Sequence, residues 1–143
     1  MNAKELYAYL GTKYAHSYFG SYEELNVLLD SIPAANYPCV VVIPVSKQIT
    51  FVADRFRIVE TVVVASLSLM ELDFSTEAIY DTVKRLEVDL MSKLYPIQKN
   101  ILSYQVLSEL NKFDAKQFQS STKELFENIE FMIGNNYMLV SLD

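Results

Sequence analysis

The chain has 143 residues, of which 51% are apolar, and its formal net charge is −6. A chain of this length buries about 70% of its unfolded surface in one core, and the apolar content excludes a disordered tail. Proteins that bind nucleic acids tightly usually carry a basic stripe that neutralises phosphates, and this acidic chain lacks one. We therefore expect a single domain, residues 1–143, with a surface to which DNA does not adhere.

No segment of the sequence predicts a membrane span or an export signal. The longest mainly apolar run, Val62 to Met70, is much shorter than the roughly 20 residues that cross a bilayer. The N-terminus carries Lys4 and Glu5 without an apolar signal core, so we expect no secretion. The single cysteine excludes an internal disulfide, which is typical of a reducing compartment. We expect no membrane partner.

Residues 1–33 are expected to form an N-terminal helical segment. The first helix runs from Ala3 to about Ala15, because apolar residues recur three or four positions apart on one face: Leu6, Tyr7, Leu10 and Tyr14. Gly20 ends this part, and Ser21 to Glu24 form a capping box that begins a second helix. Pro33 ends that helix, whose apolar residues are Leu25, Leu28, Leu29 and Ile32.

Residues 37–143 are expected to form a core of sheet and helix. Its first strand is short, from Cys39 to Ile43, and lies between Pro38 and Pro44. Proline donates no hydrogen bond to a ladder and favours extended geometry at the residue before it. Pro38 is therefore expected to lead into the strand and Pro44 to end its pairing. The uninterrupted apolar run predicts that both faces of the strand are covered.

Residues 45–57 leave two interpretations open. They form either a short strand, Gln48 to Val52, followed by a turn at Asp54, or a projecting loop. Lys47, Arg55 and Arg57 make the segment locally basic in both cases. We expect it to contact a partner, although an ordinary solvated loop has the same composition.

A long strand is predicted from Ile58 to Met70. One face is expected to be pure core: Val59, Thr61, Val63, Ala65, Leu67 and Leu69. The other face is half apolar and half small and polar: Ile58, Glu60, Val62, Val64, Ser66, Ser68 and Met70. This second face is expected to lie either under the N-terminal helices or against another subunit.

The main helix is predicted to follow this strand. Ser75 is its expected N-cap, and Glu77 lies in the positive first turn. Pro96 closes the helix near Tyr95. One stripe of apolar residues should face the core: Ile79, Val83, Leu86, Leu90 and Leu94.

The C-terminal part is predicted to be strands. Alternating apolar residues in 101–110 favour a strand over the alternative of a helix. Lys112 to Thr122 form a polar excursion, and Gly134 to Asn136 predict a turn before the last strand, Tyr137 to Leu142. The sum is a single α+β domain. Its mixed, mostly antiparallel sheet of four to six strands packs with the N-terminal helices and one long central helix.

No catalytic, cofactor or metal site is predicted. His16 has no local carboxylate partner and fits a surface or capping role, and Cys39 fits a small buried hydrophobe. Asp73 to Glu77 resemble the start of a calcium loop, but Ala78 and Lys84 replace the Gly and Glu that such a loop needs. We therefore expect a protein without catalysis.

The order of these elements resembles a known family. The segments NYPCVVVIPV, RIVETVVVASLSLMELDFSTEAIYDTVKRLEVDLMSKLYP and SYQVLSELNKFDA resemble the small tail-completion proteins of long-tailed bacteriophages and prophages. These are also called tail terminator or head–tail joining proteins. The resemblance covers residues 37–115 and the last hairpin, whereas the N-terminal helices and residues 116–122 depart from the pattern.

The resemblance implies a structural virion protein of the tail or neck, assembled in the host cytoplasm. Such a protein forms a ring, usually a hexamer, which caps the tail-tube protein and meets the head-connector proteins, and DNA passes through its lumen. A ring needs heterologous contacts between copies. The candidate interface residues are Lys47, Arg55, Arg57, Val62, Val64, Ser66 and Ser68. The alternative is a small cytoplasmic adaptor or regulatory binding domain without catalysis.

Overall fold

The structure is a computed structural model that describes residues 1–21, 23–24, 31–70, 75–107, 114–119 and 128–143. Its helices are α1 (Ala3–Leu10), α3 (Thr76–Leu94) and the 3-10 helices η1 (Ala34–Asn36) and η2 (Tyr95–Asn100). Its strands are β1 (Ser17–Phe19), β2 (Cys39–Val52), β3 (Arg55–Met70), β4 (Ile101–Val106), β5 (Asp114–Gln119) and β6 (Asn128–Leu142).

One six-stranded sheet organises the described residues. Its order is β1-β2-β3-β6-β4, and β5 pairs with the first part of β6. The β1–β2 pair is parallel and the other pairs are antiparallel. The predicted α+β class, with a mixed, mostly antiparallel sheet and one long helix, is confirmed.

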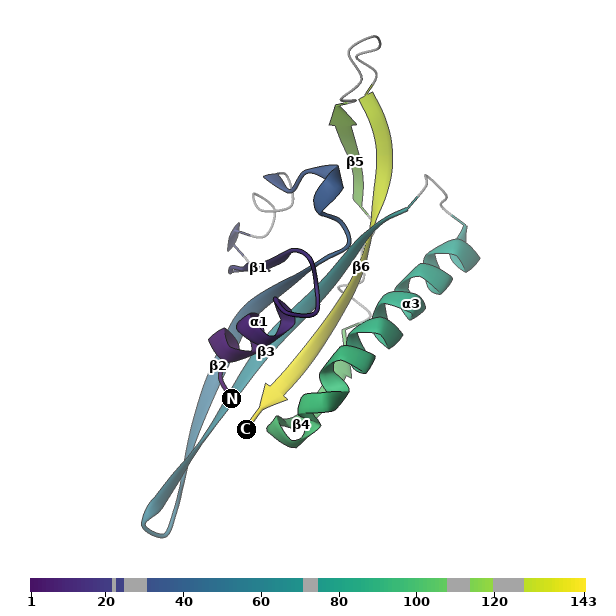
Figure 1. Cartoon of the computed structure of the whole chain (residues 1–143). Coiled ribbons are helices and arrows are strands. Elements are labelled where there is room, and N and C mark those ends of the chain that lie inside the picture. Colours follow the sequence, from purple (N-terminus) through teal and green to yellow (C-terminus); the bar gives the residue numbers. More distant parts are fainter. Residues whose placement is uncertain (22, 25–30, 71–74, 108–113, 120–127) are drawn as a thin grey trace.

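Helices α1 and α3 cover one face of the sheet. α1 lies over β2 and β3, and α3 lies over β3 and β6 (Figure 1). The two helices bury a first core with the strands below them. Its fully buried members include Leu6, Leu10, Val40, Val42, Val62, Val64, Leu90, Leu94, Met138 and Val140.

A second core lies on the opposite face. It gathers Ile32 with alternate residues of β2, β3 and β6, because successive side chains of a strand point to opposite faces. Its buried members include Cys39, Val41, Ile43, Val63, Ala65, Leu67 and Tyr137. Both faces of the Cys39–Ile43 run are therefore covered, as its sequence predicts.

The local signals around the helices are largely confirmed. The Ser75 hydroxyl accepts a hydrogen bond from the Ala78 amide at 3.3 Å, and α3 ends at Leu94, before Pro96. The Glu24 amide donates to the Ser21 hydroxyl at 3.3 Å, as a capping box requires. The body of the predicted second helix, residues 25–30, lies outside the described residues. β4 confirms the strand predicted after Pro96.

The first helix is shorter than predicted. α1 ends at Leu10, and the next amides, those of Thr12 and Lys13, bond to carbonyls three residues back. The predicted buried face nevertheless holds, because Leu6, Leu10 and Tyr14 are buried. Tyr14 thus reaches the core from a turn and not from a helix.

The prediction that Pro44 ends its strand is wrong. β2 continues to Val52, and a β-bulge at Val45 shifts the register between Pro44 and Ser46. β1 pairs only with residues 40–42 of β2, so Pro44 lies at an edge, where its missing N–H costs no ladder bond.

The predicted turn at Gly134 to Asn136 is also wrong. β6 runs unbroken through these residues, which pair with Ser68, Leu67 and Ser66 of β3. Gly134 has no positive φ, so the turn chemistry of the tripeptide is not used. Long-range pairing with β3 overrides the local preference. The polar excursion from Lys112 likewise contains a strand, β5.

Candidate interaction surface on the β2/β3 hairpin

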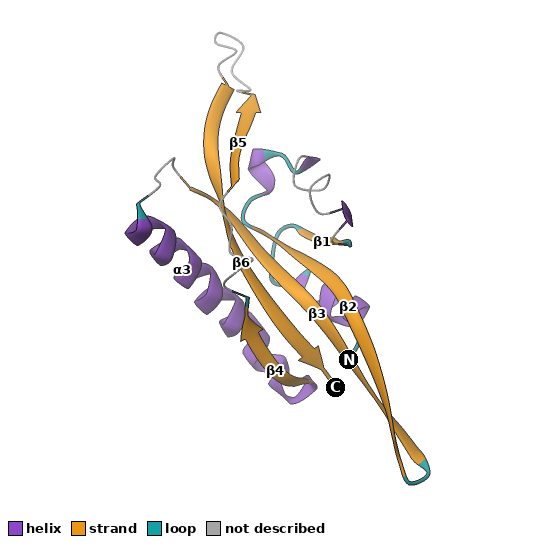
Figure 2. Ribbon diagram, turned by 180° about the vertical axis from the view of Figure 1, so that it is seen from behind, coloured by secondary structure: helices purple, strands orange, loops and turns teal. Residues whose placement is uncertain are grey.

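The outer parts of β2 and β3 form a two-stranded arm that extends beyond the rest of the sheet. β6 pairs with β3 only as far as Glu60, and β1 pairs with β2 only at residues 40–42. Residues 45–58 therefore have each other as strand partners, and Figures 1 and 2 show them projecting past both helices. All of these residues are exposed. The two interpretations of this segment are both partly right, since it is a hairpin that projects.

The tip of the arm is a two-residue connection, Ala53 and Asp54. Val52 pairs with Arg55 on either side of it. Ala53 has a φ of 54°, in the left-handed region that favours glycine. The predicted turn at Asp54 is therefore present, and it holds Ala53 in a strained conformation.

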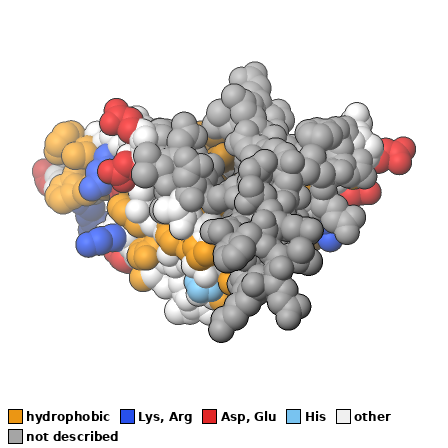
Figure 3. Space-filling model, turned by 90° about the horizontal axis from the view of Figure 1, so that it is seen from above, with side chains coloured by type: hydrophobic (Ala, Val, Ile, Leu, Met, Phe, Trp, Pro, Cys, Tyr) orange, Lys and Arg blue, Asp and Glu red, His pale blue; other side chains and the backbone are white. Residues whose placement is uncertain are grey.

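One face of the arm is made of four large apolar side chains. Ile49 pairs with Ile58 and Phe51 with Phe56, and antiparallel partners lie on the same face. Phe51 is 78% exposed and Phe56 is 66% exposed. We call Ile49, Phe51, Phe56 and Ile58 the apolar face of the arm. In Figure 3, hydrophobic and basic side chains gather at the left end of the molecule, the end toward which the arm projects in Figure 1.

The opposite face of the arm carries the predicted arginines. Arg57 donates from Nε and Nη2 to the two carboxylate oxygens of Asp143, at 2.9 and 2.7 Å. This hydrogen bond and the charge of Asp143 raise the pKa of Arg57, and the same bond lowers the pKa of Asp143. Lys47 and Arg55 are exposed, so they stay available to a partner. Arg57 instead ties the base of the arm to the end of β6.

The structure corrects the other predicted interface residues. Val62, Val64 and Ser66 are at most 1% exposed, because α1 and α3 cover that face of β3. Asn136 Nδ2 donates to the Ser66 hydroxyl at 3.4 Å. Ser68 is half-buried and lines a small hollow against α3. Val62, Val64 and Ser66 are therefore core positions that offer no surface to another chain, and Ser68 is half-buried beside α3.

The apolar face of the arm is not among the predicted interface residues, although the sequence contains a signal for it. From Ile49 to Phe51 and from Phe56 to Ile58, apolar side chains recur at every second position, as in a strand with one apolar face. This alternation does not identify a strand face as long as Pro44 is expected to end the strand before it. Once the hairpin register is fixed, the two short alternations fall on the same face.

A second exposed apolar group lies on α3. Tyr80, Val88, Met91 and Tyr95 are all more than 40% exposed, and their spacing places them on one outer stripe of α3 and η2. Lys84 lies within the stripe, with its ammonium 5.9 Å from the centre of the Tyr80 ring. We call these five residues the α3 stripe. The buried Leu90 and Leu94 lie on the opposite side of the helix.

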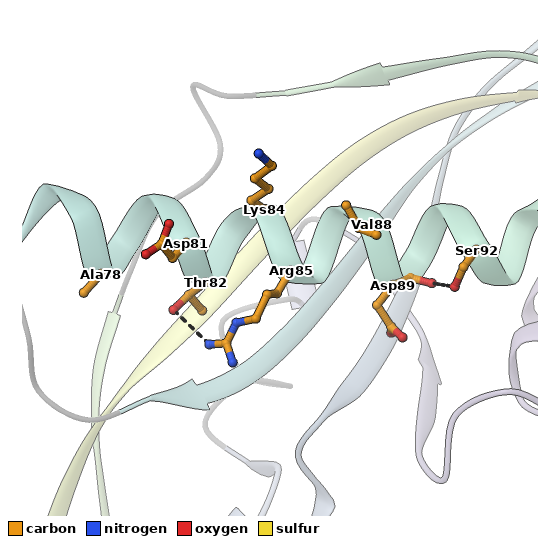
Figure 4. Close-up of a pocket in the computed structure, with 8 residues that line it drawn as sticks. All are labelled: Ala78, Asp81, Thr82, Lys84, Arg85, Val88, Asp89 and Ser92. Carbon is orange, nitrogen blue, oxygen red and sulfur yellow. Dashed lines mark hydrogen bonds between the residues drawn. The ribbon is translucent and has the colours of Figure 1, made fainter.

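An open groove follows α3 beside this stripe (Figure 4). Arg85 Nη2 donates to the Thr82 hydroxyl at 3.5 Å, and the Ser92 hydroxyl donates to the Asp89 carbonyl at 2.6 Å. Figure 4 shows Lys84 pointing to the opposite side of the helix from Arg85 and Asp89. The groove therefore has a mixed polar lining, while the stripe next to it is mainly apolar.

Two N-terminal tyrosines fix α3 in position. The Tyr9 hydroxyl donates to the Lys93 carbonyl at 2.6 Å, and the Tyr14 hydroxyl donates to Asp89 Oδ2 at 3.3 Å. The Lys93 ammonium lies 2.7 Å from Asp89 Oδ2 and 3.8 Å from the centre of the Tyr14 ring. Burial and the Asp89 charge raise the pKa of Tyr14 far above its ordinary value. The outward presentation of the α3 stripe thus depends on contacts with the N-terminal segment.

The residues singled out for chemistry have structural roles. The His16 carbonyl accepts from the Val40 amide at 3.3 Å, and Cys39 is fully buried. Within the described ranges, no three His, Cys, Asp or Glu side chains are grouped so that they could hold a metal ion. No helix in the described part of the chain has the length and apolarity that a membrane crossing requires.

Comparison with known proteins finds no match, either among protein-family models or among curated proteins.

Proposed function

We propose that the chain is a structural subunit that assembles into a ring, and that this ring completes the tail of a long-tailed phage. One observation carries the self-assembly: the apolar face of the arm projects away from the core and is left open by the subunit's own helices. The resemblance of the sequence to tail-completion proteins gives the assembly its place, between the tail tube and the head connector.

The energetics of the arm favour a closed assembly over isolated pairs. Complete burial of a large apolar side chain contributes about 1.5–3 kcal/mol, so the four side chains of the apolar face contribute about 6–12 kcal/mol. Association of two proteins costs about 4–15 kcal/mol in lost translational and rotational freedom. This cost is of the same order as the contribution of the apolar face. One arm contact alone is therefore marginal. A ring adds a final contact without another loss of freedom, so closure stabilises every subunit.

The acidic composition is compatible with a channel for DNA. The net charge is −6, and fixed negative charge on a lumen repels phosphates, so a duplex would slide and not adhere. The proposed partners are copies of the chain, the tail-tube protein and the head-connector proteins. DNA is a passing cargo and not a bound ligand.

The experiment that tests this function measures assembly directly. Native mass spectrometry and negative-stain electron microscopy of the purified chain, over a series of concentrations, should show one closed ring of fixed copy number. The double variant Phe51→Ser/Phe56→Ser should lose the ring and keep its circular dichroism spectrum. The matched control Val52→Ser removes an exposed apolar side chain from the opposite face of the arm and should still form rings.

A second measurement tests the place of the ring in a virion. Genes for portal, capsid and tail-tube proteins should lie beside the gene for this chain, and the tail-tube protein encoded there should bind the ring. A chain that remains a monomer at high concentration, with that tail-tube protein present, would contradict the proposal and favour the adaptor alternative.

A further inference from the structure

We propose that the apolar face of the arm of one subunit packs against the α3 stripe of the next subunit. This inference rests on the proposed self-assembly and goes beyond it by naming both halves of the contact. Among the described residues, the exposed large apolar side chains fall mainly into these two groups, the arm and the outer side of α3 with η2. The others are Phe19 in β1 and Leu102 and Tyr104 in β4.

The arm is nearly as long as the stripe, and its apolar face, from Ile49 to Phe51, covers about 7 Å of that length. The stripe runs from Tyr80 to Tyr95, which at 1.5 Å per residue is about 22 Å. The arm from Ser46 to Val52 spans six residue steps, which at about 3.3 Å per residue is about 20 Å. A strand pair laid along the helix therefore reaches the stripe over nearly its whole length. Aromatic side chains are present on both surfaces, and such residues are enriched in interface cores.

The apolar face of the arm and the α3 stripe of the same subunit do not contact each other. The stripe faces away from its own sheet, because Leu90 and Leu94 hold the opposite side of α3 against β3 and β6. The arm leaves the body beyond Glu60 and extends past the helices (Figure 1). Within the described part of the chain no segment covers either surface, so the proposed occupant of each comes from another molecule.

The charges favour a second copy of this chain as that occupant. Residues 45–58 contain Lys47, Arg55 and Arg57 against one carboxylate, Asp54, so the arm carries +2. The whole chain carries −6, so the rest of each copy carries −8. An arm is therefore attracted to the body of any other copy. On α3, the spacing of Glu77, Asp81 and Glu87 places these carboxylates within or beside the stripe, which itself contains one cation, Lys84.

The contact is heterologous, since the patch that one copy donates differs from the patch that the next copy presents. Each subunit then has one arm and one stripe, so head-to-tail contacts generate either a ring or an open filament. This geometry distinguishes the inference from an arm that meets the arm of its partner, which would give dimers only.

Mixing two defective variants tests this geometry. Phe51→Glu/Phe56→Glu destroys the arm surface, and Val88→Glu/Met91→Glu destroys the stripe. Each variant alone should be a monomer by native mass spectrometry. An equimolar mixture has one intact arm and one intact stripe to pair, so at high concentration it should give a one-to-one heterodimer and nothing larger. Val52→Glu, on the opposite face of the arm, is a charge control that should assemble as the original chain does.

Crosslinking places the contact at residue level. Copies carrying Phe51→Cys and copies carrying Val88→Cys, mixed and oxidised, should form a disulfide-linked dimer, whereas Thr50→Cys copies, whose substituted side chain lies on the other face, should not. Cys39 is buried and does not interfere.

The outcomes separate this inference from the function on which it rests. If the original chain forms rings and the stripe variant forms them too, the named contact is wrong while the ring-forming function stands. If the original chain is a monomer under all conditions, both are wrong. A monomer that binds phosphatidylserine vesicles through Phe51 and Phe56 would identify a lipid surface as the occupant and overturn the inference.

Discussion

Arg57 of β3 holds the carboxylate of Asp143 through two hydrogen bonds, at 2.9 and 2.7 Å, between residues 86 positions apart. The pair lies where the arm leaves the sheet, because Glu60 is the last residue of β3 that pairs with β6. It therefore connects the base of the arm to the end of β6. Both side chains are partly exposed, so the pair orients the arm more than it stabilises the fold.

The first prediction concerns the titration of Asp143. The hydrogen bond from Arg57 lowers the pKa of Asp143 below its ordinary value of 3.8. A depressed pKa contributes stability that is present above pH 3.8 and is lost as the pH falls through the lower folded value. Carbon-detected NMR should show the pKa of Asp143 rising in Arg57→Gln. Lys47→Gln, which removes a cation from the same arm, should leave that pKa unchanged, and an equal rise in both variants would contradict the pairing.

The second prediction concerns alkaline pH. Burial and the Asp89 carboxylate raise the pKa of Tyr14 above its ordinary value of 10.0. A raised pKa contributes stability that is fully present below pH 10.0 and is lost as the pH rises toward the folded value. The loss proceeds at up to about 1.4 kcal/mol per pH unit. The free energy of unfolding of Tyr14→Phe should therefore fall less steeply above pH 10 than that of the original chain. Parallel curves for the two proteins would show that Tyr14 ionises freely in the folded chain.

The parts of the fold that the sequence predicts well are governed by neighbouring residues. Ser75 caps α3 through a hydroxyl three residues from its donor, and Pro96 cannot continue the helix. The apolar run from Cys39 to Ile43 also reads directly as a strand with two covered faces. Such features need no knowledge of the rest of the chain.

The parts that the sequence predicts badly depend on distant partners. Gly134 to Asn136 have the composition of a turn, yet β3 holds them extended. Pro44 predicts a strand end only if β2 needs hydrogen bonds on both of its edges at this residue. One edge has no partner strand there, because β1 pairs only with residues 40–42. The sequence allows Val62 and Val64 to lie either under the N-terminal helices or at a subunit interface, and the structure places them under α1 and α3. The apolar face of the arm can be predicted only when the register of β2 and β3 is known, because its four side chains come from both strands.

The third prediction separates the core from the arm. Val64 lies fully buried in the first core, so Val64→Asp places an unpaired carboxylate there, which costs several kcal/mol. Thermal melting should show an unfolded or strongly destabilised chain, and any loss of rings should follow from unfolding. Phe51→Asp puts the same charge on the exposed arm; it should lose assembly and, in dilute solution where both proteins are monomers, melt like the original chain. A folded Val64→Asp that still melts cooperatively at the original temperature would contradict the assignment of this face to the core.

The fourth prediction concerns the two sides of α3. Leu90 is fully buried and Val88 is 58% exposed, two residues apart on the same helix. Leu90→Ala should lower the free energy of unfolding by about 2–5 kcal/mol, because it leaves a cavity under α3. Val88→Ala should change it by no more than about 0.5 kcal/mol when measured on monomers, because an exposed side chain loses little packing. Urea denaturation of both variants, in dilute solution, gives the comparison, and equal losses would mean that the helix is rotated from its described position.

The last prediction concerns the tip of the arm. Ala53 has a φ of 54°, where an L-residue costs roughly 1–2 kcal/mol and glycine costs none. Ala53→Gly should therefore slow hydrogen exchange of the arm amides between Ser46 and Arg57, despite the greater freedom of glycine in the unfolded chain. Ala53→Val, whose branched side chain fits this region worse, should speed that exchange. Neither change should shift the thermal midpoint of the body, because the arm beyond Glu60 pairs only with itself among the described residues. Faster exchange in the glycine variant would show that the connection does not hold Ala53 in the left-handed region.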